Sequence, residues 1–150
     1  MASTLTHLVF HVVFSTKGRM PLIDSSLRTE LDAFVGGIVR NLGGSLIAIG
    51  GMPDHTHLLV KLRAETSVAE LVRVVKANSS RWVHGRHPKY QGFAWQAGYG
   101  AFSVSGSQVE VVRRYVRSQE DHHRTMSFLD EYRAFLKRHE IAFDERYLVD

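Results

Sequence analysis

Cysteine is absent from this 150-residue sequence, which excludes disulfides, a thiol nucleophile and any thiolate metal site. A bound metal ion would therefore need nitrogen and oxygen ligands. The sequence also lacks an apolar run approaching the roughly 18 residues of a membrane-spanning helix. Because the first basic residue is Lys17, the N-terminus does not have the charged start of a signal peptide. These absences predict a cytoplasmic protein with no membrane partner.

Internal repeats, low-complexity tracts and Pro/Ser-rich linkers are also missing, so we expect one domain that spans residues 1–150. Hydrophobic residues make up 44% of the chain and charged residues 23%, which are ordinary values for a soluble globular protein. A disordered chain, a collagen-like structure and a coiled coil are therefore excluded.

The net charge of +4 is unevenly distributed along the chain. Residues 76–125 carry 8 basic and 3 acidic side chains, and the basic ones include Arg113, Arg114, Arg117 and Arg124. A local excess of positive charge suits a polyanion, most simply a nucleic acid. The alternative is a solvated helix face that has no partner.

The periodicity of apolar residues predicts strands over residues 7–16, 45–50, 55–62 and 93–104. Spacings of three and four residues predict helices over 24–42, 67–83 and 107–123, and a last helix that begins near Phe128. Two capping boxes, Ser67-x-x-Glu70 and Ser107-x-x-Glu110, mark helix starts. The order β-α-β-β-α-β followed by helices predicts an α+β ferredoxin-like split βαβ sandwich, with one sheet face under two helices.

His55-Thr56-His57 begins the third predicted strand. Residues two apart on a strand share a face, so both imidazoles project together from the side of the sheet opposite the two helices. Paired imidazoles with this geometry are good ligands for a divalent metal. The alternative is two half-buried histidines that have separate hydrogen-bond partners.

The helix predicted after the fourth strand carries a second group of polar residues. Val111, Tyr115, Gln119 and His122 lie within a stripe about 80° wide. An adjacent stripe of valines can anchor the helix in the core. The alternative is a tyrosine at the edge of the core and a glutamine in solvent.

Together these two groups resemble the HUH transposases of the IS200/IS605 type, which have one tyrosine and belong to the superfamily of REP-associated tyrosine transposases. The resemblance covers nearly the whole chain, and its motifs are residues 10–19, 51–60, 95–104 and Tyr115–Gln119, followed by His122 and His123. One departure is Thr56, because the family usually has a bulky apolar residue between the histidines. Thr56 would point to the helix-covered face, so the departure concerns local packing.

The resemblance implies a transposase that cleaves and rejoins single-stranded DNA at hairpin-containing ends through a 5′-phosphotyrosine. It implies Tyr115 as the nucleophile and His55, His57 and Gln119 as ligands of Mg²⁺ or Mn²⁺, with His122 in reserve as a ligand or proton carrier. It also implies a homodimer, and it places the helix that bears Tyr115 on the sheet face opposite the first two helices.

Candidate phosphate contacts are Lys17, Arg19, Lys76 and Arg81. Trp82, Trp95 and Tyr99 could stack on unpaired bases, although a core position is favoured for Trp95. Three alternatives stay open: a rolling-circle-type nickase with the same site, a non-catalytic module that binds single-stranded DNA or RNA, and an inactive domesticated copy.

Overall fold

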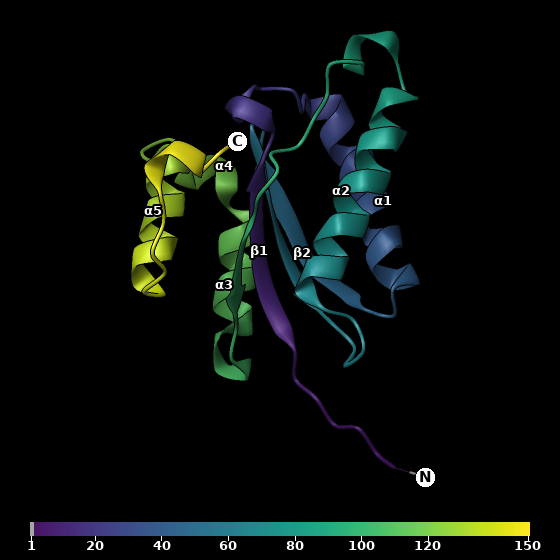
Figure 1. Cartoon of the computed structure of the whole chain (residues 1–150), viewed down its shortest axis with the longest axis vertical. Coiled ribbons are helices and arrows are strands. Elements are labelled where there is room, and N and C mark those ends of the chain that lie inside the picture. Colours follow the sequence, from purple (N-terminus) through teal and green to yellow (C-terminus); the bar gives the residue numbers. More distant parts are fainter. Residues whose placement is uncertain (1) are drawn as a thin grey trace.

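A four-stranded antiparallel sheet lies between two groups of helices in the computed structural model, which describes residues 2–150 (Figure 1). The strand order is β2-β3-β1-β4. The bounds are β1 (Val9–Ser15), β2 (Ser45–Met52), β3 (His55–Lys61) and β4 (Gly100–Ser103). With the helices described next, the chain order is β-α-β-β-α-β. The predicted ferredoxin-like α+β fold is therefore confirmed.

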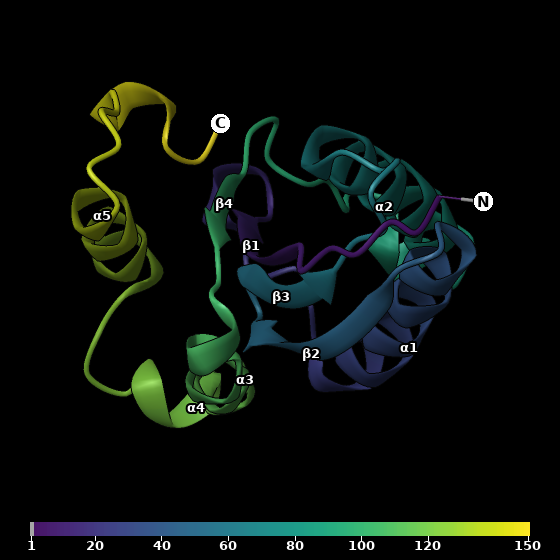
Figure 2. The ribbon, with the colours of Figure 1, turned by 90° about the horizontal axis from the view of Figure 1, so that it is seen from below.

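Helices α1 (Ser25–Asn41) and α2 (Val68–His84) cover one face of the sheet (Figure 2). The hydroxyl of Ser67 accepts a hydrogen bond from the backbone N–H of Glu70 at 3.1 Å, so Ser67 caps α2 as predicted, while the carboxylate of Glu70 pairs with Arg73 instead of closing the capping box. The core on this side joins inward strand residues to the apolar stripes of both helices. Its members include Val12, Leu58, Val60, Leu31, Val35, Leu71 and Val75.

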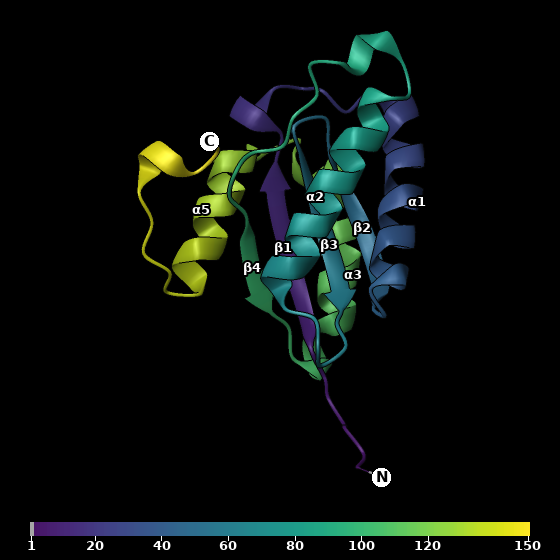
Figure 3. The same cartoon turned by 45° about the vertical axis from the view of Figure 1, so that its right-hand side comes forward.

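The opposite face is covered by α3 (Val109–Arg117), α4 (Gln119–His122) and α5 (Phe128–Arg138). In Figure 3, β4 lies at the edge of the sheet between β1 and α5. Val13 and Phe102 of the sheet pack there against the apolar stripe of α5. Burial of this stripe brings the C-terminal segment over the face that carries the predicted histidines.

The fourth strand and the helix after it are shorter than predicted. Only four residues of the predicted strand 93–104 pair continuously. The backbone N–H of Gln96 still donates to the carbonyl of Ser15, but the N–H of Ser15 is taken by the side chain of Gln96 at 2.8 Å, which interrupts the ladder. The predicted helix over 107–123 is broken at Ser118, whose φ and ψ are −104° and 28°. Ser107 does not cap this helix. It lies in a 3₁₀ turn, Gly106–Gln108, so the second predicted capping box is wrong.

None of the helices within residues 2–150 combines the length and the hydropathy needed to cross a bilayer.

Candidate active site

His55 and His57 are fully buried between the sheet and the helices of the second group. Their ring centroids are 5.1 Å apart. Thr56 points the other way, where its hydroxyl accepts a hydrogen bond from Arg28 and donates one to the carbonyl of Gly50. The alternation of side chains along β3 therefore places the two imidazoles together, as the spacing predicts, and a small polar residue fits between them.

The ring of His55 is oriented by the carboxylate beside it. Its Nδ1 lies 2.7 Å from Asp54 Oδ1, so Nδ1–H donates to Asp54. The other nitrogen, Nε2, faces Gln119 Oε1 at 3.2 Å. A carboxylate behind an imidazole that fixes its tautomer is the usual arrangement for a histidine that binds a metal.

The ring of His57 is held between a second imidazole and a carboxylate. Its Nδ1 lies 2.8 Å from His11 Nε2, and its Nε2 lies 2.9 Å from Glu131 Oε1. Burial lowers the pKa of His11 to about 3 and that of His57 to about 4, because desolvation disfavours the charged imidazolium. Both rings are therefore neutral at pH 7, which is the form of histidine that can bind a metal.

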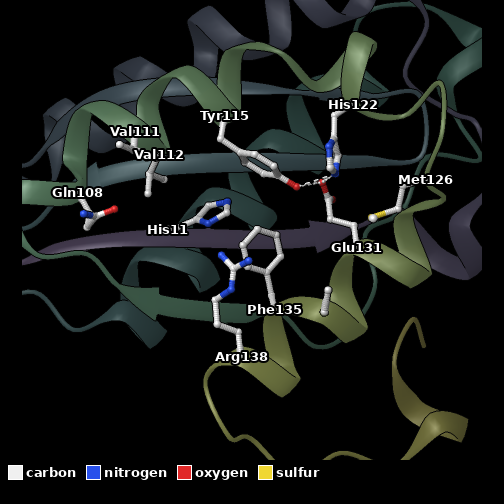
Figure 4. Close-up of a pocket in the computed structure, with 11 residues that line it drawn as sticks. His11, Gln108, Val111, Val112, Tyr115, His122, Met126, Glu131, Phe135 and Arg138 are labelled. Atoms are coloured by element: carbon white, nitrogen blue, oxygen red, sulfur yellow. Dashed lines mark hydrogen bonds and ion pairs between the residues drawn. The ribbon is translucent and has the colours of Figure 1, made fainter.

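Tyr115 extends from α3 into the space between α3 and α5, where a pocket of about 250 Å³ opens beside it (Figure 4). Its hydroxyl donates to Glu131 Oε2 and lies 2.9 Å from His122 Nε2. Burial raises the pKa of Tyr115, and the hydrogen bond and negative charge of Glu131 raise it further. In this state the phenol is a neutral donor.

Gln119 is buried at the start of α4, directly after the break at Ser118. Its Nε2 donates to the carbonyl of Tyr115 at 3.2 Å, which fixes the direction of the amide. Oε1 is thereby directed at His55 Nε2 and at His123 Nε2, the latter 3.0 Å away. The structure thus brings together Tyr115, Gln119 and the two histidines of β3.

Glu131, on α5, is a central residue of the site that sequence reasoning missed. Its side chain is 1% exposed. Burial alone would raise the pKa of its carboxyl, but hydrogen bonds from His123, His57 and Tyr115 hold that pKa well below its usual range. A signal existed in the sequence, because Glu131 lies on the apolar stripe of its helix, three residues after Phe128 and four before Phe135.

His123 is the second missed residue, since only its neighbour His122 was considered for a role. His123 Nδ1 lies 2.6 Å from the carbonyl of Met126, and Nε2 lies 3.3 Å from Glu131 Oε2. Burial works to lower the pKa of His123, but the hydrogen bond and charge of Glu131 raise it. A signal existed here too, because His123 lies four residues after Gln119, the spacing of one helical face, although the structure places it in the turn after α4.

One nitrogen or oxygen from each of His55, His57, His123 and Glu131 lies within 4.8 Å of the others. Two ligands on opposite sides of an ion bound at about 2.1 Å are roughly 4.2 Å apart. The group therefore needs only a small inward movement to surround one ion. Neutral imidazoles and an ionised carboxylate are the donors that divalent metals bind, so these residues fit a metal.

The predicted phosphate contacts lie in different places. Lys17 and Arg19 are exposed in a 3₁₀ turn after β1, and Arg19 lines a hollow that also includes Asp54 and His123. Arg81 lies on α2, on the other side of the sheet, beside Trp82. The ammonium of Lys76 donates to three backbone carbonyls.

The predicted stacking residues also lie away from Tyr115. Trp95 packs edge-on against Phe14 and donates to Ser79 at 3.0 Å, so it joins the core on the α1–α2 side. Trp82 stacks on Phe34 with ring centroids 4.8 Å apart. Tyr99 is 38% exposed and lies close to the ammonium of Lys76.

A ferredoxin-like sheet that places a His-x-His pair beside one helical tyrosine defines the class of HUH proteins with a single tyrosine. Residues 4–119 match the family of IS200-like transposases, and the chain belongs to that family. Its members are transposases that act on DNA. The family match ends at Gln119, so His123 and Glu131 lie outside it.

The chain is similar to the ISDra2 transposase TnpA of Deinococcus radiodurans, with 24% identity over 119 residues that cover 76% of this chain and 85% of the relative. It also resembles a solved transposase structure from Deinococcus radiodurans R1, with a TM-score of 0.61, 23% identity, and coverage of 77% of this chain and 93% of that one. A REP-associated tyrosine transposase bound to a REP hairpin has a TM-score of 0.55 and 13% identity, over 77% of this chain and 68% of that one. At these identities the solved structures show a common fold.

Proposed function

We propose that this protein cleaves and rejoins single-stranded DNA at hairpin-containing ends, with Tyr115 as the nucleophile and a divalent metal held by His55, His57 and Gln119. The observation that carries the proposal is the carboxylate of Glu131, which contacts the hydroxyl of Tyr115 and the imidazole of His57 at once. A nucleophile and a candidate metal site that share one carboxylate are close enough to act on the same phosphate.

In the proposed reaction the oxygen of Tyr115 attacks phosphorus, and the bond from phosphorus to the 3′ oxygen breaks. The leaving 3′ oxygen takes a proton from water, so the products are a 5′-phosphotyrosine and a free 3′-hydroxyl. The phenolic proton has two acceptors within hydrogen-bond distance, His122 Nε2 and Glu131 Oε2. Attack by another 3′-hydroxyl on the phosphotyrosine reverses the step and joins strands. No external energy is needed, because one phosphate ester bond forms for each one that breaks.

A bound divalent ion would supply positive charge that stabilises the phosphate oxygens as negative charge develops on them. The chain adds its own cation nearby, because Arg138 of α5 lines the pocket beside Tyr115 (Figure 4). Arg19, which shares a hollow with His123, and the neighbouring Lys17 of the same 3₁₀ turn would extend the phosphate contacts.

Hairpin recognition and a homodimer are also part of the proposal. Both come from the family resemblance, and the hairpin is supported by the relative that was solved with a REP hairpin bound. Light scattering of the purified protein, alone and with hairpin DNA, measures the mass and tests the dimer.

The experiment uses labelled single-stranded hairpin DNA from the protein's own locus, incubated with Mn²⁺, Mg²⁺ or EDTA and separated on denaturing gels. We expect a metal-dependent band shifted by one protein mass. The band should be lost in Tyr115→Phe and kept in Tyr147→Phe, which removes an exposed phenol far along the chain. DNA retention by Tyr115→Phe on native gels separates loss of chemistry from loss of binding.

Covalent attachment by Tyr115→Phe would show that another residue is the nucleophile. Retarded complexes on native gels, with no covalent band from the wild-type protein under any metal condition, would favour the binding module or the inactive copy.

A further inference from the structure

We propose that His123 and Glu131 are additional metal ligands of this protein, so that three imidazoles and one carboxylate surround an ion of the transition series rather than Mg²⁺. The inference rests on the proposed function and deepens its metal site. It concerns residues beyond the part of the chain that matches the family.

The first argument is that the four proposed ligands converge at a site that is buried from solvent. His55 and His57 are fully buried, Glu131 is 1% exposed, and the side chain of His123 is 7% exposed. They come from β3, from the turn after α4, and from α5, and their ligand atoms still meet within 4.8 Å. Buried polar groups are costly unless each has a partner, and in the described part of the chain these atoms find theirs in one another and in Gln119. Such a convergence of donor atoms is the arrangement that one ion could bridge.

The second argument is the direction of the hydrogen bonds. The Nδ1–H groups of His55 and His123 donate outward, to Asp54 Oδ1 and to the carbonyl of Met126. A neutral ring with this orientation carries a lone pair on Nε2, whereas a protonated His123 donates from Nε2 to Glu131. These lone pairs face Gln119 Oε1, whose direction is fixed by the bond from its own Nε2 to Tyr115.

The carboxylate of Glu131 adds two more acceptors to the same space, 3.7 Å from His55 Nε2 and 3.3 Å from His123 Nε2. Acceptors that face acceptors repel one another unless a cation lies between them. The cation is either a proton on an imidazole or a metal ion, and a metal satisfies all of these atoms at once.

The third argument is that the surrounding groups already hold the ligands in place. Asp54 orients His55, a backbone carbonyl orients His123, and His11 lies behind His57. Partners of this kind fix ligating histidines in metal sites generally. Glu131 is oriented through its second oxygen, which accepts the hydroxyl of Tyr115. The ion and the nucleophile would therefore share one carboxylate.

The donor set determines which metal fits. Mg²⁺ prefers oxygen ligands and keeps several waters, which a buried group of imidazoles does not accommodate. Imidazoles suit first-row transition metals, whose affinity for such ligands rises from Mn²⁺ to Cu²⁺ and is higher for Zn²⁺ than for Mn²⁺. We therefore expect Zn²⁺ to bind more tightly than Mn²⁺, and Mn²⁺ more tightly than Mg²⁺.

The test measures metal binding without DNA. Protein freed of metal with EDTA is dialysed against Zn²⁺, Mn²⁺ or Mg²⁺ and its metal content is determined. The variants are Glu131→Gln and His123→Gln. The matched controls are Asp130→Asn, which removes an exposed carboxylate from the same helix, and His139→Gln, which removes an exposed imidazole. Circular dichroism of each metal-free variant checks that it is folded.

We expect one Zn²⁺ per chain, and an affinity at least about 10-fold lower in Glu131→Gln and in His123→Gln, because loss of a ligand exceeds the usual effect of losing an outer partner. The controls should bind as the wild type does. The rise in melting temperature that Zn²⁺ gives the wild type should be smaller in both variants.

The inference is overturned if both variants bind Zn²⁺ like the wild type, if Mg²⁺ binds most tightly, or if the wild type binds no metal. A Tyr115-dependent covalent band together with any of these results would leave the proposed function standing. A Zn²⁺ site that depends on Glu131 and His123, with no covalent band, would support the inference and reject the function.

Discussion

The buried carboxylate of Glu131 remains ionised because hydrogen bonds from His57, His123 and Tyr115 compensate for its loss of water. The rings of His57, His122 and His123 and the hydroxyl of Tyr115 lie around its two oxygens. Removal of one member of such a network leaves the others unpaired, which costs more than the net value of one hydrogen bond. The network therefore holds α5 to the rest of the site.

Lys76 illustrates a charged residue with a structural role. Its ammonium donates to the carbonyls of Gln96, Ala97 and Gly98, and partial burial lowers its pKa to about 8. These bonds hold the segment that leads into β4. A lysine whose three donors are already used has none free for a phosphate.

Lys76→Met should lower the free energy of unfolding by about 1–3 kcal/mol, because it leaves three carbonyls of the loop without their donor. Urea unfolding measures the change, and Lys137→Met, at an exposed position on α5, is the control. Equal stability of the two variants would show that the bonds to the loop contribute nothing.

At the scale of elements, the position of α3 depends on a close approach to β2. A Cβ atom built on Gly50 would lie 2.2 Å from the carbonyl oxygen of Val116, a backbone atom that cannot move without the helix. Since Val116 is next to Tyr115 and three residues before Gln119, this contact also sets the distance of both side chains from β3.

Gly50→Ala should cost about 1–3 kcal/mol of stability through overpacking and should displace α3, with loss of metal affinity. Gly37→Ala is the matched control, because that glycine lies in α1 with only a flexible arginine side chain near its Cβ position. Alanine there should stabilise the helix by up to about 1 kcal/mol. Unchanged stability of Gly50→Ala in urea would contradict the close packing.

At the scale of the whole molecule, the sheet face under α3, α4 and α5 contains buried imidazoles that are neutral in the folded protein. The pKa values of His11 and His57 are lowered to about 3 and about 4, so the unfolded chain binds more protons than the folded one below pH 6.5. Glu131 faces both rings, and His139 faces His11. The raised pKa of His123 acts in the opposite direction.

Stability in EDTA should therefore be full above about pH 6.5 and should fall as the pH decreases toward 4. Between pH 7.5 and 5.5 we expect a loss of about 1–3 kcal/mol, since each buried neutral histidine contributes about 1.4 kcal/mol per pH unit. Urea unfolding at several pH values measures it. A free energy of unfolding that is constant over this range would mean that the two rings are accessible to protons in the folded state.

The sequence by itself determined the fold class, the order of the elements, and the placement of His55, His57, Tyr115 and Gln119. These follow from local rules, because the period of a strand or a helix decides which side chains share a face. The short β4, the break at Ser118 and the failed cap at Ser107 were not predictable in this way. They depend on which groups compete for the same backbone hydrogen bonds in the folded protein. For example, the side chain of Gln96 accepts the N–H of Ser15.

Only the tertiary structure decided that Glu131 joins His57, 74 residues away along the chain, and that His123 faces His55. The sequence position of a residue on an apolar stripe does not determine which residues it contacts in the folded protein. Packing of α5 on Val13 and Phe102 brings the helix to this face of the sheet. Burial of an apolar stripe is not directional, so the hydrogen bonds of Glu131, which need one geometry, select the position.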